Sequence, residues 1–123
     1  MATKTIVVRF EKRPEGLHFT FEPESTGFHV GDTVELVLAD DLGDGVRFAV
    51  QEPWILAPED PPGRFAPTRS ADGRRVEVRY LGPEVDAVRK YAYHVHVESQ
   101  GQVYRSDGYP TVNQHPPIGG GGG

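Results

Sequence analysis

The chain has 123 residues, a formal net charge of −5 and no cysteine. Its length predicts a single domain, and a hydrophobic content of 37% is sufficient for a packed core. The negative net charge argues against a nucleic-acid partner, because affinity for phosphates comes from clustered Lys and Arg. The lack of cysteine excludes disulfides and suits a cytoplasmic protein. No segment approaches the ~20 apolar residues that cross a bilayer, so we expect no membrane partner.

Apolar residues alternate along the chain with the period of two that is typical of β-strands. Turn-forming pairs such as Gly31-Asp32 and Asp72-Gly73 separate the alternating stretches. About seven short strands joined in this way predict an all-β domain, a single Greek-key β-sandwich. The side chains expected to face its core are Ile6, Val8 and Phe10 in 5–10; Leu17, Phe19 and Phe21 in 17–22; Val34, Leu36 and Leu38 in 33–39; Val46, Phe48 and Val50 in 46–51; and Val76, Val78 and Tyr80 in 75–80.

The turn at residues 40–45 contains Asp40, Asp41 and Asp44. Three carboxylates in one tight loop are ligands of the kind that calcium prefers, but the spacing lacks the regular acidic pattern and the distal glutamate of an EF-hand. We therefore interpret this turn as an acidic hairpin loop. The chain also lacks an elbow-type nucleophile motif and a glycine-rich phosphate loop, which favours a non-enzymatic role.

A long proline-rich connection spans residues 52–74. Structureless loops above about 12–15 residues are uncommon inside compact domains and are often functional. The connection carries Trp54, Ile55 and Phe65, and large apolar side chains of this kind anchor protein interfaces. Two interpretations stay open: Trp54 and Phe65 cover an open end of the sandwich, or the loop binds another protein through these three residues.

The clearest alternation lies in residues 91–98. It places Tyr91, Tyr93, Val95 and Val97 on the core face, and Ala92, His94, His96 and Glu98 on the outward face. A slip of one residue would expose four apolar side chains, so this register is strongly specified. We therefore expect both imidazoles to face outward and to meet solvent.

His94 and His96 are also candidate ligands of a metal ion. Two imidazoles that leave one face of a strand can converge on zinc or another divalent metal. Glu98 continues the row, and a third ligand from elsewhere would be His18, His29 or His115. The competing interpretation is an ordinary solvated row of polar side chains, for which no cofactor is expected.

Two parts of the sequence together resemble a known family. The stretch Phe28-x-Val30-Gly31-Asp32-Thr33-Val34 resembles the front half of a cupredoxin-like sandwich. The stretch Tyr91-x-Tyr93-x-Val95, followed by the exit 107–113, resembles the final hairpin of copper-free cupredoxin-like proteins. The resemblance, which covers residues 17–113, implies a cupredoxin-like sandwich, and an immunoglobulin-like one is the alternative. A classical copper site requires a Cys thiolate and is excluded.

The last residues, 114–123, are rich in proline and glycine and predict a flexible tail behind a domain of residues 1–113. The Gly-Gly within this tail resembles the end of ubiquitin-like sulfur carriers, although three more glycines follow the pair. The sequence thus favours a non-enzymatic module that contacts a protein partner through its proline-rich loop. The alternatives are a metal-binding protein built on His94 and His96, and a Gly-Gly carrier.

Overall fold

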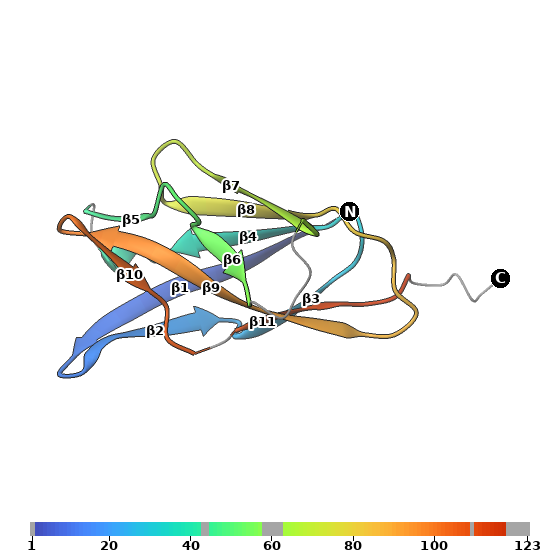
Figure 1. The fold of residues 1–123 in the computed structure, drawn as a ribbon, viewed down its shortest axis with the longest axis horizontal. Helices are drawn as coiled ribbons and strands as arrows, with labels where there is room; N and C mark the ends of the chain where they lie inside the picture. Colours follow the sequence, from blue (N-terminus) through green and yellow to red (C-terminus); the bar gives the residue numbers. More distant parts are fainter. Residues whose placement is uncertain (1, 43–44, 58–62, 109, 118–123) are drawn as a thin grey trace.

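The computed structural model describes residues 2–42, 45–57, 63–108 and 110–117 as an all-β sandwich of two mixed sheets, which confirms the predicted fold class (Figure 1). The described residues form eleven strands, where about seven were expected. They are β1 (Thr3–Arg13), β2 (Gly16–Glu22), β3 (Ser25–Phe28), β4 (Thr33–Leu38), β5 (Val46–Phe48), β6 (Trp54–Leu56), β7 (Phe65–Arg69), β8 (Arg75–Tyr80), β9 (Arg89–Ser99), β10 (Gln102–Arg105) and β11 (Thr111–Gln114), with a short 3-10 turn at Asp40–Leu42.

The first sheet has the strand order β2-β1-β4-β8-β7. Its inward side chains are those that the alternation predicts, and Ile6, Leu36 and Val76 are completely buried. The pair β1 and β4 is parallel, whereas the other neighbours are antiparallel. The sheet is mixed because the chain leaves it after β2, forms β3 in the second sheet and returns as β4.

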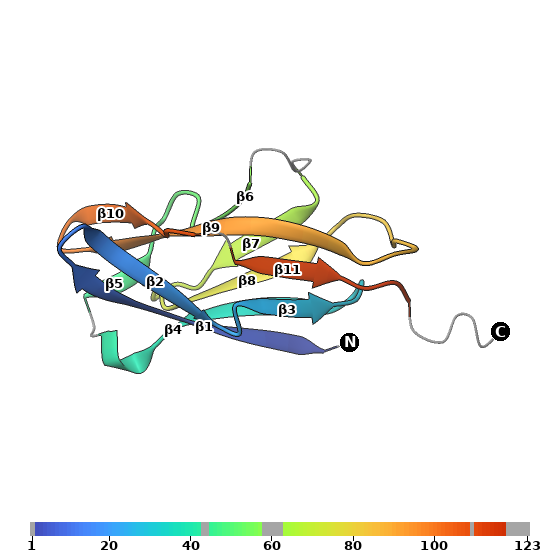
Figure 2. The ribbon, with the colours of Figure 1, turned by 90° about the horizontal axis from the view of Figure 1, so that it is seen from below.

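The second sheet is organised around the long strand β9. Strands β10 and β11 follow one another along one edge of β9, and β5 and β6 do the same along the other edge. Strand β3 then pairs in parallel with β11. Figure 2 shows β9 and β10 above β1 and β4. The buried hydrophobic side chains of the two sheets form one cluster.

The core contains the residues that the sequence places there. Val34, Leu36, Phe48, Val78, Tyr93 and Val95 are all buried. The expectation for Val50 is wrong, since this side chain is 68% exposed. Its strand, β5, ends at Phe48, and residues beyond that point leave the ladder, so the alternation no longer determines where their side chains lie.

Two turns explain how the strands around the site are connected. Gln100 and Gly101 both have positive φ angles, 53° and 77°, as the two-residue turn of a tight hairpin requires. They join β9 to β10. At the other turn, the carboxylate of Asp32 accepts hydrogen bonds from the amides of Ala2 and His29 at 2.8 and 3.0 Å. This aspartate ties the start of β1 to the β3–β4 turn.

The proline-rich segment 52–74 is not structureless. It contains β6, which extends the second sheet, and β7, which forms the edge of the first. Sequence reasoning also missed β3 and β11. Strand β11 includes Gln114, whose side chain is completely buried, so the packed part of the chain extends at least one residue beyond the expected boundary.

Candidate functional site

The outward face of β9 carries the histidine pair, but its two imidazoles lie in different environments. His94 is only 4% exposed, which contradicts the expected contact with solvent. The chain after β10 continues alongside β9, where the Ser106 amide and hydroxyl bond to the carbonyl and amide of Val95. His94 Nδ1 lies 3.2 Å from the Ser106 carbonyl oxygen. Burial lowers the pKa of His94, and the charge of Arg105 acts in the same direction.

His96 is half-buried and faces the opposite edge of β9. Its Nδ1 lies 2.7 Å from the Glu52 carbonyl oxygen, so the Nδ1 atoms of the two histidines contact different segments. No set of three or more His, Asp or Glu residues that could hold a metal occurs in the described parts of the chain. His18, His29 and His115 therefore do not complete a three-ligand site with this pair.

Two of the three residues expected to anchor a partner belong to the core. Trp54 lies opposite Val95 in the β6–β9 ladder and so shares its inward face. Its side chain is 4% exposed and stacks on Tyr93, with ring centroids 5.3 Å apart. Phe65 is half-buried and packs edge-on against Tyr80 and Tyr91. Trp54 thus belongs to a strand and not to a loop, and its buried ring is not open to a partner.

Ile55 faces the other way. It lies directly opposite His94, and residues paired across an antiparallel ladder point to the same face of the sheet. The structure therefore brings Ile55 from the proline-rich segment and His94, His96 and Glu98 from β9 onto one surface. The sequence presented these residues as two unrelated candidate sites.

A bulge between β5 and β6 shapes this surface. The Ala49 amide bonds to the His96 carbonyl and the His96 amide bonds to the Pro53 carbonyl, so residues 50–52 project out of the ladder. Glu52 has a positive φ of 50° there. Val50 projects beside His96 and Glu98, and Val103 on β10 lies opposite Glu98. Together they border a hollow of about 400 Å³. We call these four residues (Val50, His96, Glu98 and Val103), together with Ile55 on the same face of the sheet, the β9 surface.

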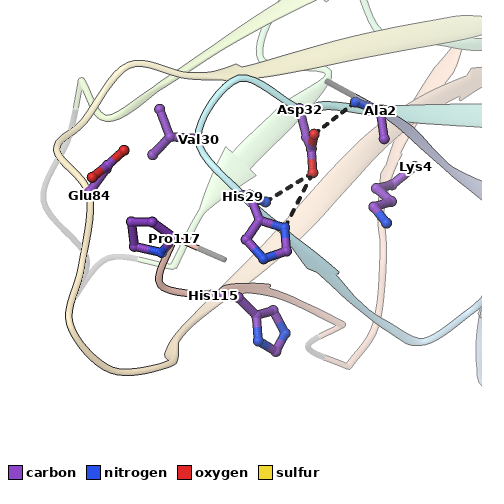
Figure 3. Close-up of a pocket in the computed structure, with 8 residues that line it drawn as sticks. All are labelled: Ala2, Lys4, His29, Val30, Asp32, Glu84, His115 and Pro117. Atoms are coloured by element: carbon purple, nitrogen blue, oxygen red, sulfur yellow. Dashed lines mark hydrogen bonds and ion pairs between the residues drawn. The ribbon is translucent and has the colours of Figure 1, made fainter. Parts of the chain in front are cut away.

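A second hollow, of about 460 Å³, lies where the two ends of the described chain meet. Its lining includes Lys4, His29, Asp32, Glu84 and His115 (Figure 3). The rings of His29 and His115 have centroids 5.7 Å apart. His29 Nδ1 is 3.7 Å from Asp32 Oδ2. Burial acts to raise the pKa of Asp32, but hydrogen bonds from two backbone amides and the charge of Lys4 outweigh it and lower that pKa.

The third notable cluster joins the two sheets at the β2 edge. Asp107 accepts a hydrogen bond from the Phe19 amide at 2.8 Å, and its other oxygen lies 3.0 Å from His18 Nδ1. Partial burial would raise the pKa of Asp107, but the Phe19 amide and His18 lower it overall. This carboxylate accepts a hydrogen bond from a backbone amide of the edge strand β2 and so links the segment after β10 to the first sheet.

The remaining sequence candidates are tested only in part. Asp40 and Asp41 lie in a 3-10 turn, and Asp41 accepts two hydrogen bonds from Arg9 at 3.0 Å. Residues 43–44 of this loop and residues 118–123 of the tail lie outside the described residues. The calcium and Gly-Gly carrier hypotheses therefore stay predictions.

No protein-family model matches this sequence, and no curated protein is significantly similar to it. In the part of the chain that the structure describes, no helix has the length and apolar character needed to cross a membrane.

Proposed function

We propose that this chain is a small, non-enzymatic, cytoplasmic module that contacts another protein through the β9 surface. The observation that supports this most directly is the pair of exposed valines at the hollow. Val50 is 68% exposed and Val103 is 58% exposed. Both side chains lie on the outward face of the same sheet, on opposite sides of β9.

The composition of the surface suits a protein partner. Protein interfaces combine an apolar centre with a polar rim, and here the two valines and Ala49 lie next to His96, Glu52 and Glu98. The hollow between them has room for an apolar side chain of the partner. The polar rim would then pair with donors that surround this anchor.

The β9 surface includes only part of the proline-rich segment that the sequence predicts to contact a partner. Ile55 is the only one of the three expected anchors that faces outward with the β9 surface. Trp54, which is buried against Tyr93, holds the backbone beside it in a rigid strand. A binding surface on a rigid strand loses less conformational entropy on association than one on a free loop.

The experiment compares charge substitutions at three exposed valines. Val50→Asp and Val103→Asp place a carboxylate at the hollow, whereas Val88→Asp makes the same change at a residue that is 52% exposed and does not line it. We expect the first two variants to lose a partner that the wild-type chain captures and the Val88 variant to retain it. All three variants should keep the wild-type melting temperature, because they alter exposed positions.

Equal capture by all three variants would contradict the proposal. A photo-crosslinking amino acid at position 50 provides an independent test, because a specific partner must be labelled from position 50 and not from position 88. Labelling of a second copy of this chain would identify the β9 surface as a self-association surface and would argue against a distinct partner. The cupredoxin-like resemblance also stays a proposal about the type of sandwich, and the β9 surface does not depend on it.

A further inference from the structure

We propose that His29 and His115 form a binding site for a late first-row divalent metal ion such as Zn²⁺, at the hollow between β3 and β11. This site is separate from the β9 surface and from the His94–His96 pair. Its ligands come from opposite ends of the sequence and are brought together by the parallel pairing of β3 with β11.

The backbone places the two imidazoles side by side. Asn113 and Gln114 pair with Gly27 and Phe28, and the His115 amide continues the ladder by donating to the Phe28 carbonyl at 2.8 Å. His115 therefore lies beside His29, and their ring centroids are 5.7 Å apart with 37° between the planes. In zinc sites the metal lies about 2.0–2.1 Å from each imidazole nitrogen, so two rings at this separation can share one ion after small side-chain rotations.

Asp32 orients the first imidazole. Its Oδ2 lies 3.7 Å from His29 Nδ1, on the side away from His115 in Figure 3. A carboxylate in this position favours the tautomer with a proton on Nδ1, which leaves Nε2 as the metal ligand. The side chain of Asp32 is 9% exposed and is held by the amides of Ala2 and His29, so it is a fixed outer partner.

Gly27 makes room for the second imidazole. A Cβ at this position would lie 2.5 Å from His115 Nε2 and 2.7 Å from Cδ2. The ring thus packs directly over the glycine backbone, and any larger residue would displace it.

The charges around the hollow are compatible with a cation. Lys4 is the positive side chain in its lining, and its charge acts on the carboxylate of Asp32. Glu84 lies on the opposite wall and faces the same space (Figure 3). The N-terminal ammonium also acts on Asp32, so two carboxylates balance two positive charges when both histidines are neutral, and no net positive charge opposes a cation. With two imidazole ligands, water would complete the coordination of the metal.

The test is calorimetric titration of the full chain with Zn²⁺ near neutral pH. We expect one binding event, which His29→Ala and His115→Ala each weaken by more than about tenfold, while His18→Ala and His96→Ala leave it unchanged. Asp32→Asn, which removes only the outer carboxylate, should weaken binding by about 10–100-fold. Gly27→Ala keeps both imidazoles and should also weaken binding, because it displaces the His115 ring.

A second readout does not depend on any variant. In proton NMR of the wild-type chain, Zn²⁺ should shift the imidazole signals of His29 and His115 and leave those of His18 in place. The absence of a binding event, or shifts confined to other histidines, would overturn the proposal. Binding that persists in both His29→Ala and His115→Ala but is lost in the double variant His94→Ala/His96→Ala would assign the metal to β9 instead.

Discussion

The two faces of β9 differ in how well the alternation of the sequence describes them. On the inward face, Tyr91, Tyr93, Val95 and Val97 are all completely buried, as predicted. On the outward face, His94 is buried while His96 and Glu98 are half-buried. The alternation predicts the direction of a side chain. Burial on the outward side depends on which neighbouring segments run past the strand, and here the chain after β10 approaches His94.

The largest effect should come from the inward face. Tyr93→Ala removes a ring that stacks on Trp54 and lies edge-on to Phe21, with centroids 5.8 Å apart. We expect a loss of about 3–5 kcal/mol in the free energy of unfolding, the range for large aromatic residues replaced by alanine in a core. Urea denaturation measures it. A loss below about 1 kcal/mol would mean that the inward face is not the core.

The hydroxyl of Tyr93 should have an effect of the opposite sign. Its oxygen is buried and has no hydrogen-bond partner among the described residues, and burial raises the pKa of this phenol. A buried unpaired polar group costs about 1–3 kcal/mol. Tyr93→Phe should therefore raise the free energy of unfolding by about 1 kcal/mol in the same urea experiment. A loss of stability would show that the hydroxyl has a partner.

The buried histidine of the outward face should make stability depend on pH. His94 has a lowered pKa, mainly because of burial, so the folded chain binds fewer protons here than the unfolded chain. Above the ordinary histidine pKa near 6.5, the neutral buried His94 does not lower the free energy of unfolding. That free energy decreases as the pH falls through this value towards the lower pKa of the folded state. Urea denaturation between about pH 7.5 and pH 5 should show a smaller slope for His94→Gln than for wild type. Equal slopes would count against a neutral buried His94.

The smallest effect on stability is expected at the exposed part of the outward face. Val103→Ala removes two methyl groups from a side chain that is 58% exposed. Surface changes of this kind usually alter the free energy of unfolding by no more than about 0.5 kcal/mol. Thermal denaturation checks it. A larger loss would show that Val103 is packed in the isolated chain, and the β9 surface would then be less open than its geometry indicates.

The sequence by itself determined the all-β class, the inward face of most strands and the turns at Gly31-Asp32 and Asp72-Gly73, where both glycines have positive φ angles. These features depend on local physics, because a side-chain period of two and a positive φ are properties of short segments. Local patterns also explain the errors. Local patterns place Trp54 in a loop, because a three-residue strand between prolines is too short to show alternation. Its burial comes from pairing opposite Val95 on a distant strand.

Only the tertiary structure decided which residues of distant segments meet. Ile55 and His94 share a face because β6 pairs with β9, and His29 lies beside His115 because β3 pairs in parallel with β11. Val50 and Val103 border one hollow because a bulge and a hairpin flank the same stretch of β9. Such juxtapositions depend on strand order and register between distant segments, and the side-chain pattern of a single strand carries no information about its neighbours.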